Sequence, residues 1–217
     1  MNWSEVTVSE YIEILDLQYD DLTPTELQLE SIAIVTGNDY DDLDEDEVER
    51  LLNEFKWLQD APTNEESIHR FDLLEYGSLI SLMQFSSEKP PLQNIDKICA
   101  LVIGYEDFKT KCQQIQDDYI VEYFAIVQTW IKYRTSILEN YEDLFSADEN
   151  EEVEQPDTID IIQTRWAWMR TVWELADGDI TKANDILSLP HLMVLNWITM
   201  VKDLKLNQPT QTGVDND

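Results

Sequence analysis

The sequence predicts an all-α fold, and three observations support this fold class. Apolar residues recur at spacings of three and four in several segments, which is the helical period. Residues that cap helices stand in front of those segments. Turn-forming residues are scarce, with 5 Gly and 7 Pro among 217 residues, while 43% hydrophobic residues suffice for a core. We therefore expect small helical modules joined by acidic linkers: an N-terminal helical hairpin, a long central helix and a C-terminal three-helix module.

The N-terminal module, residues 1–62, is predicted to be a helical hairpin over about residues 24–59. Its first helix begins at Thr23-Pro24, where Glu26 closes a capping box, and it ends at Gly37. Its second helix begins near Asp44, whose neighbours load the first turn with negative charge. The apolar stripe of this second helix consists of Val48, Leu51, Leu52, Phe55 and Leu58.

The central module, residues 63–147, is predicted to contain the longest helix. A helix near 78–86 stops at Lys89-Pro90-Pro91, and an apolar helix over 95–103 is interrupted by Gly104. From there the three-and-four spacing of apolar residues continues for about 40 residues. The pattern predicts one long helix, or two nearly collinear ones, over 105–145, with a length on the order of 50–60 Å.

Residues 148–157 are predicted to be an acidic linker to a C-terminal helical module, residues 158–205. Its first helix covers 159–176 and ends at Gly178. Asp179 caps a short second helix, and Pro190 opens a last helix that runs to about Leu204. Residues 206–217 are predicted to be a disordered tail.

Net charge is the strongest functional signal in the sequence. The chain holds 46 acidic and 14 basic residues, a formal net charge of −32, and its first basic residue is Arg50. Such a chain repels phosphate, which argues against specific nucleic-acid binding and against anionic membranes. The first ten residues lack the features of a secretory signal, and no apolar run approaches 18 residues, so we expect no membrane insertion. Synthesis in the cytoplasm follows.

Known catalytic and metal-binding motifs are missing from the sequence. The acidic run over 39–47 lacks the glycine that a calcium loop needs, which favours a solvated helix start. His69 and His191 lack the spacing of a zinc site with Cys99 and Cys112, which we expect to be reduced thiols. We therefore expect no cofactor, no metal and no enzymatic activity.

Aromatic residues gather in the first helix of the C-terminal module. On a helix, Trp166, Met169 and Trp173 share one side, and Trp168 points elsewhere. One interpretation is that this side packs in the core; the other is that Trp168 projects into a partner as an aromatic anchor. The residues that we expect to serve packing and partner contact are Val48, Leu51, Phe55, Trp166, Trp168, Trp173 and Trp197.

Three segments together resemble one family. Residues 30–58 show a helix, Thr-Gly, an acidic turn and a second helix; residues 71–85 lead into the apolar helix NIDKICALVIG; residues 164–203 join an aromatic helix to LADGDITK, a Leu-Pro step and a closing helix. This order resembles the acidic helical virion and tail-assembly proteins of tailed bacteriophages, most of all those of crAss-like podophages. A minimal tail chaperone of that group lacks the stretch 105–157.

The resemblance and the charge lead to an expected function. We expect a non-enzymatic, virion-associated protein, packaged in the capsid or tail lumen as cargo or structural component and released with the genome. Its partners would be other capsid, portal or tail proteins or copies of itself, met in the host cytoplasm during assembly. Two alternatives stay open: a cytoplasmic tail-assembly chaperone, and an acidic DNA mimic that occupies the basic groove of another protein.

Overall fold

The structure, a computed structural model, describes residues 2–38, 40, 43–63, 67–104, 107–145 and 168–206. The fold is all-α, and the described residues form β-structure only as two isolated bridges. Contacts divide the chain into two compact units: residues 1–71 with 81–134, and residues 72–80 with 135–217. Each unit therefore combines two stretches of chain, whereas the modules expected from sequence are continuous. The expected linker 148–157 lies outside the described residues, as does the expected tail beyond Leu206.

The first unit begins with three short α-helices, namely α1 (Val8–Asp16), α2 (Pro24–Thr36) and α3 (Glu45–Glu54). Short 3-10 turns accompany them at Trp3–Glu5, Leu17–Tyr19 and Lys56–Gln59. Each α-helix opens with a complete capping box, and Gly37 ends α2 in the left-handed conformation. The predicted starts at Thr23 and Asp44 and the predicted end at Gly37 are confirmed.

Helix α1 was absent from the sequence-based prediction, although its capping signal is present. The side chain of Thr7 accepts from the backbone N–H of Glu10 at 3.3 Å, and the Glu10 carboxylate accepts from the backbone N–H of Thr7 at 2.7 Å. This T-x-x-E pattern directly before an apolar segment marks a helix start. The nine-residue helix that follows holds Val8 and Tyr11 in the core.

The Thr7→Ala substitution tests the contribution of this cap. We expect it to lower the free energy of unfolding by about 1 kcal/mol, because the backbone N–H of Glu10 loses the Thr7 hydroxyl as its partner. Urea unfolding followed by circular dichroism measures the change. Thr7→Ser is the matched control, since it keeps the hydroxyl, and an equal loss in both variants would contradict a capping role.

The middle of the chain forms four α-helices: α4 (Tyr76–Glu88), α5 (Ile95–Ile103), α6 (Phe108–Asp117) and α7 (Ile120–Asn140). Two 3-10 turns, Phe71–Leu73 and Pro91–Asn94, stand before α4 and α5. The predicted break at the two prolines and the predicted helix over 95–103 are confirmed. Gly104, at φ +77°, allows the turn after α5.

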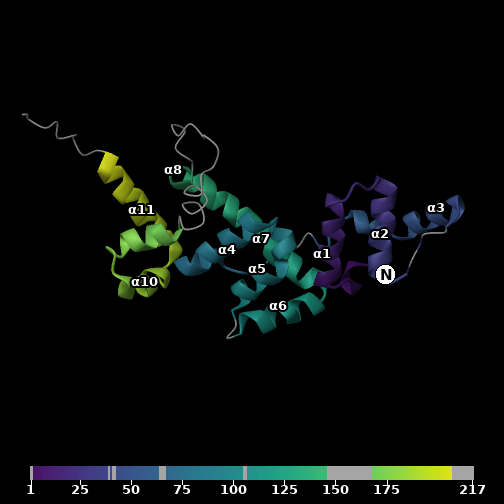
Figure 1. Cartoon of the computed structure of the whole chain (residues 1–217), viewed down its shortest axis with the longest axis horizontal. Coiled ribbons are helices and arrows are strands. Elements are labelled where there is room, and N and C mark those ends of the chain that lie inside the picture. The colour runs from purple at the N-terminus through teal and green to yellow at the C-terminus, as the bar shows by residue number, and fades with distance from the viewer. Residues whose placement is uncertain are drawn as a thin grey trace, which may run out of the picture. The chain divides into compact units, whose positions relative to one another are not determined.

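The prediction of one helix, or two nearly collinear ones, over 105–145 was wrong. The chain breaks at Asp118, which is extended, and α6 packs back against α5 (Figure 1). A backbone bridge causes the break: the N–H of Val8 donates to the Asp118 carbonyl, and the N–H of Ile120 donates to the Val6 carbonyl, both at 2.9 Å. A partner more than 100 residues away in sequence thus replaces two helical hydrogen bonds. The longest described helix is α7, with 21 residues.

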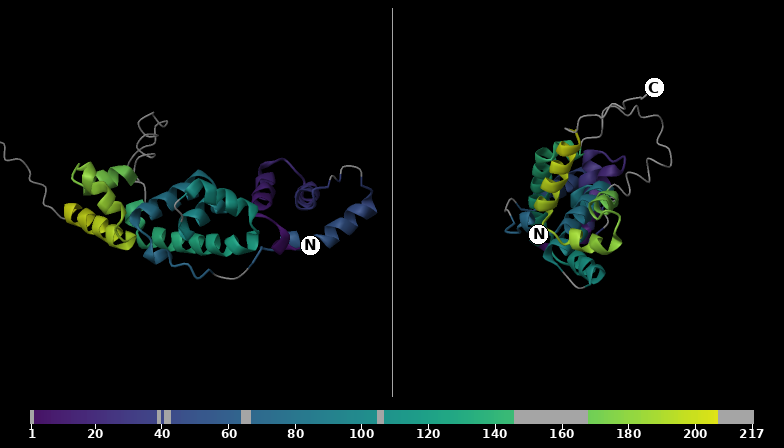
Figure 2. Two further views of the ribbon diagram at one scale, coloured as in Figure 1. Left: turned by 90° about the horizontal axis from the view of Figure 1, so that it is seen from below. Right: turned by 90° about the vertical axis from the view of Figure 1, so that its left-hand side faces the viewer.

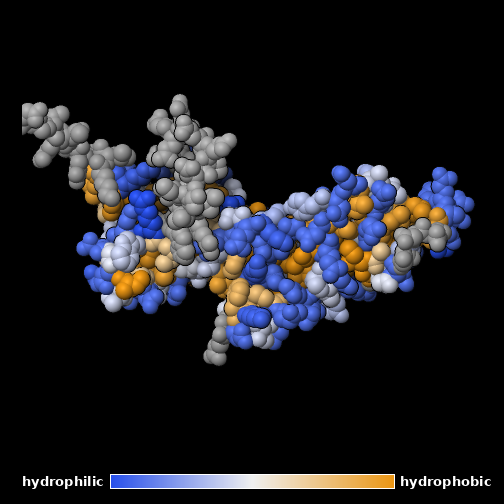
Figure 3. Space-filling model, in the orientation of Figure 1, coloured by the Kyte–Doolittle hydropathy of each residue, from blue (hydrophilic) through white to orange (hydrophobic). Residues whose placement is uncertain are grey.

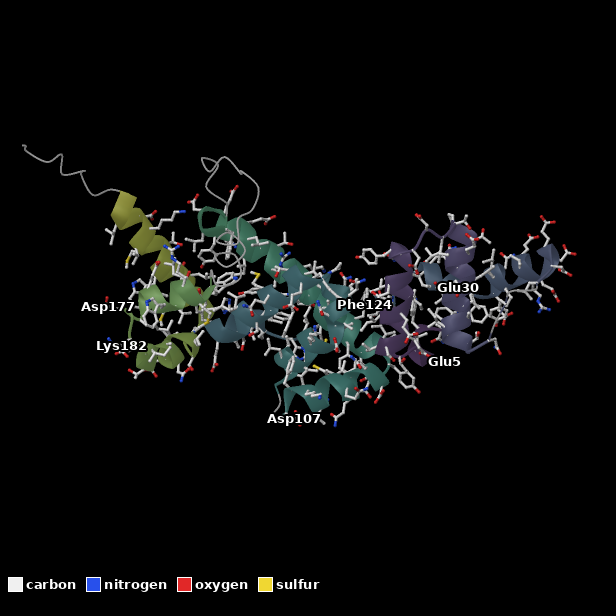
Figure 4. The ribbon with its side chains drawn as sticks, viewed as in Figure 1. Glu5, Glu30, Asp107, Phe124, Asp177 and Lys182 are labelled. Carbon is white, nitrogen blue, oxygen red and sulfur yellow. The ribbon has the colours of Figure 1, made fainter. Side chains whose placement is uncertain are left out.

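Aromatic side chains fill the core of the first unit. Phe124 of α7, labelled in Figure 4, meets Tyr11 of α1 edge to face, with ring centroids 5.9 Å apart. Trp3 contacts Tyr11 and Trp57 in the same manner, at 5.6 and 5.2 Å. These contacts join the N-terminal helices to α7 within one core.

The second unit contains α8 (Glu142–Phe145), a helical stretch over 168–175, α10 (Ile180–Leu187) and α11 (His191–Leu206). Asp179 caps α10, as predicted, and Gly178 turns the chain at φ +73°. The backbone N–H of Tyr76 donates to the Leu189 carbonyl at 2.8 Å, beside a bridge between Glu75 and Pro190. The start of α4 is thereby fixed to the turn that precedes α11. No described helix is long and apolar enough to cross a bilayer.

Candidate protein-binding surface

The predicted contact residues of α3 lie largely inside the first unit. Leu51 and Phe55 are buried, and Val48 is half-buried. The Phe55 ring lies 6.1 Å from that of Trp57, which in turn contacts Trp3. The apolar stripe of α3 therefore serves packing of its own unit, and Leu51 and Phe55 are not available to a partner.

The aromatic helix of the second unit packs inward through the side that carries Trp168. Trp168 is half-buried and its ring lies 5.6 Å from Phe145 and 6.3 Å from Tyr76. Val172 and Ala176, at helical spacing from it, are buried. Trp173 is 51% exposed, so of the two sides that the sequence left open, the side of Trp168 packs inward and the side of Met169 and Trp173 faces solvent. Trp166 lies outside the described residues.

The positions of Met169 and Trp173 around the axis of this helix explain why both are exposed to solvent. Residues 168, 172 and 176 follow a four-residue spacing and contact the rest of the unit, whereas 169 and 173 are displaced by about 100° around the axis. Met169 is 40% exposed, and Arg170 pairs with Glu174 at 2.9 Å on the solvent side. Trp173 also covers Gly178, where a Cβ atom would lie 3.4 Å from its ring.

Helix α11 carries the clearest unpartnered apolar surface among the described residues. We call it the α11 stripe, and it consists of Met193, Trp197, Met200 and Leu204, which are 49%, 43%, 52% and 59% exposed. The predicted contact residue Trp197 thus lies at its centre. Figure 2 shows α11, in yellow, as one continuous helix, and Figure 3 shows hydrophobic residues at the surface over its end.

The opposite face of α11 packs against its own unit. His191, Val194 and Leu195 are almost completely inaccessible to solvent. The Tyr141 hydroxyl donates to Oδ1 of Asn196 at 2.9 Å, and the Lys202 ammonium donates to the Asp143 carbonyl. These contacts fix the rotation of α11 about its axis, so the α11 stripe faces outward. Exposed apolar side chains in a row of this kind form a surface of the type that protein-binding sites use.

Charge is distributed unevenly between this surface and the N-terminal helices. The first 49 residues hold 16 acidic and no basic side chains. Three of those carboxylates, Glu10, Glu26 and Glu47, accept hydrogen bonds at the starts of their own helices. The pKa of Glu26 is lowered by the hydrogen bonds from Thr23, so this group stays ionised. Among residues 168–206, by contrast, the charges nearly balance.

Metal-ligating and nucleophilic side chains are present among the described residues. Within those residues, no cluster of three His, Cys, Asp or Glu side chains can hold a metal ion; Asp39, Asp41 and Asp42 of the acidic run lie outside them. Burial raises the pKa of the Cys99 thiol and raises that of Cys112 to about 11, so both stay protonated and weakly nucleophilic. His191 is buried against the Leu74 carbonyl, with Nδ1 2.8 Å from that oxygen.

The first unit also contains a shallow groove. Its volume is about 540 Å³, and it is lined by Pro62, Thr63, Ser67, Ile68, His69, Val121, Glu122, Ala125 and Ile126. The Ser67 hydroxyl lies 2.7 Å from Nδ1 of His69, two residues further along the chain. The backbone N–H of Ser67 donates to the hydroxyl oxygen of Thr129 at 3.1 Å. The bond to His69 is local, whereas the bond to Thr129 holds Ser67 against α7; together they order the segment 67–69.

Comparison with known proteins gives no assignment. No family model, no curated protein and no solved structure matches this chain.

Proposed function

We propose that this protein is non-enzymatic and acts by binding other protein chains, as an acidic helical component of a tailed-phage particle. In this role it is packaged in the capsid or tail as cargo or structural component and is released with the genome. The observation that carries the protein-binding part is the α11 stripe, four large apolar side chains that the fold holds toward solvent. The phage context rests on the sequence resemblance of segments 30–58, 71–85 and 164–203.

The net charge of −32 gives this proposal a physical mechanism. Inside a particle, packed DNA presents a dense array of phosphates, and an acidic protein is repelled by it. The protein therefore does not become trapped on the genome and is free to leave with it. The partners are other capsid, portal or tail proteins, or further copies of this chain.

Quantitative mass spectrometry of purified particles, before and after genome ejection, tests the proposal. We expect the protein in intact particles and a loss of at least about tenfold after ejection, relative to the major capsid protein. Equal amounts in both states would make it a fixed structural part. Absence from intact particles would overturn the virion role.

An assembly chaperone is the second candidate, because an exposed apolar helix also suits the transient covering of a client protein. It predicts that the protein accompanies a tail protein in infected cells and is absent from finished particles. The DNA-mimic alternative predicts salt-sensitive binding to a DNA-binding protein through the N-terminal helices. Pulldown at low salt that recovers no such protein would end the mimic hypothesis.

A further inference from the structure

We infer that the shallow groove of the first unit binds a protein segment in which a lysine or arginine lies between apolar residues. We call this hollow the α7 groove, because one of its walls is α7 and the other is formed by residues 62–63 and 67–69. The inference deepens the proposed function and rests on it only in taking the ligand to be a protein chain. The α7 groove belongs to the first unit, whereas the α11 stripe belongs to the second.

The two walls of the α7 groove are joined by hydrogen bonds within the protein. The backbone N–H of Ser67 donates to the Thr129 hydroxyl at 3.1 Å, and that hydroxyl donates to the Ala125 carbonyl at 2.8 Å. The backbone N–H of His69 donates to the Ser67 hydroxyl at 3.2 Å. These bonds place the segment 67–69 against α7 without any ligand, so binding would not have to order this wall.

Apolar side chains form more than half of the lining of the α7 groove. They are Pro62, Ile68, Val121, Ala125 and Ile126. Ile68 is 94% exposed, so a bound segment would cover an apolar side chain that water now surrounds. A hollow that is mostly apolar with a few polar groups is typical of ligand sites in proteins. The aliphatic stem of a lysine or arginine and its apolar neighbours suit such a lining.

Charge decides which polar group the ligand carries. Glu122 lines the α7 groove and is exposed, whereas no lysine or arginine is among the lining residues. Its carboxylate forms no ion pair and accepts no hydrogen bond within the part of the chain that the structure describes. An unpaired carboxylate beside apolar groups attracts a cation, and the net charge of −32 draws cations toward the whole chain. The ligand therefore carries a positive charge.

The size of the α7 groove favours a segment of chain over a small amine. Its volume is about 540 Å³, which one lysine side chain fills only in part. Room remains for apolar neighbours of the basic residue, and the apolar members of the lining lie on both walls. A basic residue with an apolar residue on each side therefore matches both the charge and the volume of the hollow.

Nuclear magnetic resonance of the ¹⁵N-labelled full chain at neutral pH tests the inference. The probe is the peptide acetyl-Leu-Lys-Leu-amide, for which we expect a dissociation constant on the order of 1 mM. The largest shifts should occur at the backbone amides of residues 67–69 and 121–126. The same peptide with norleucine in place of lysine should bind at least about fivefold more weakly, because it lacks the ammonium group.

Two variants of the protein test the two parts of the site. Glu122→Gln should raise the dissociation constant of the lysine peptide at least about fivefold, because the ammonium group loses its partner. Glu139→Gln is the matched control: it removes the same charge from an exposed position of the same helix outside the α7 groove, and it should bind like the wild type. Ile68→Ser should weaken binding about threefold, because less apolar surface is covered.

Three results would overturn the inference. The first is the absence of shifts at the α7 groove up to about 5 mM peptide. The second is an equal loss of affinity in Glu122→Gln and Glu139→Gln, which would reduce the effect to the general attraction of an acidic chain. The third is binding of n-butylammonium as tight as that of the peptide, which would overturn the assignment to a protein segment. None of these results bears on whether the protein occurs in phage particles, which the mass spectrometry tests separately.

Discussion

Replacing Trp130 with alanine is expected to lower the free energy of unfolding of the first unit by about 3–5 kcal/mol. Trp130 belongs to the part of α7 in that unit, and its side chain is completely buried. Its indole N–H donates to the Ser86 hydroxyl at 2.9 Å. Its ring lies 5.6 Å from Phe71 and 6.4 Å from Tyr133, measured between centroids. Truncation therefore removes a large apolar surface, leaves a cavity and takes away a hydrogen-bond donor.

Urea unfolding monitored by far-ultraviolet circular dichroism measures this loss. Trp130→Phe is the milder variant, since it keeps one aromatic ring but loses the indole N–H and the contacts of the second ring; we expect it to cost about 1–2 kcal/mol. Trp173→Ala is the control for a half-exposed tryptophan and should cost clearly less than Trp130→Ala, because about half of its side chain is already in contact with solvent. A Trp130→Ala variant as stable as the Trp173→Ala variant would contradict the central place of Trp130 in this core.

Helix starts and ends were predictable from sequence because their causes are local. The capping boxes at Thr23 and Asp44 each need only a side chain and its neighbours up to three residues away. The same holds for Gly37 and for Asp179, which caps α10. Helix α1 has an equally local signal at Thr7, so it too was within reach of sequence reasoning.

The break between α6 and α7 was not predictable in this way, because its cause is distant in sequence. The apolar spacing continues across Asp118, and the backbone hydrogen bonds that hold the chain extended there run to Val6 and Val8. Which side of the aromatic helix packs inward is likewise decided by residues that are distant in sequence. Trp168 is held inward by Tyr76 and Phe145, which come from other parts of the chain. In a helix with apolar residues on several sides, the sequence period alone does not choose the buried side.

The candidate surface was predictable only in part. Trp197 and Trp173 are partly exposed, as a partner-contact role requires, while Leu51 and Phe55 are buried in the core of the first unit. The other members of the α11 stripe were missed, although their spacing of four, three and four is visible in the sequence. The sequence alone did not show which face of α11 packs inward. In the structure the buried side chains of His191 and Leu195 mark that inner face.

Replacing His191 with alanine is expected to lower the free energy of unfolding by about 2–4 kcal/mol at pH 8. The imidazole is completely buried, and because a carbonyl only accepts, Nδ1 must donate to the Leu74 oxygen 2.8 Å away. The substitution leaves a cavity at the base of α11, and the Leu74 carbonyl keeps only the hydrogen bond from the backbone N–H of residue 191, 3.1 Å away. His191→Gln should cost less, since its amide can donate to the same oxygen.

The same histidine should make stability depend on pH in a defined direction. Burial lowers the pKa of His191 below its ordinary value of 6.5, an effect that the Leu74 hydrogen bond and the charge of Asp72 only partly oppose. As the pH falls through about 6.5, the unfolded chain takes up a proton before the folded one does, so the folded state loses stability until the folded pKa is passed.

Unfolding of wild type and His191→Gln at several pH values between about 8 and 5.5 isolates this effect. The quantity to compare is the free energy of unfolding of the wild type minus that of His191→Gln at each pH. The chain's many carboxylates respond to pH in both proteins, and this subtraction removes their shared contribution. We expect the stability advantage of the wild type to shrink steadily as the pH falls. An advantage that stays constant would mean that His191 titrates alike in both states.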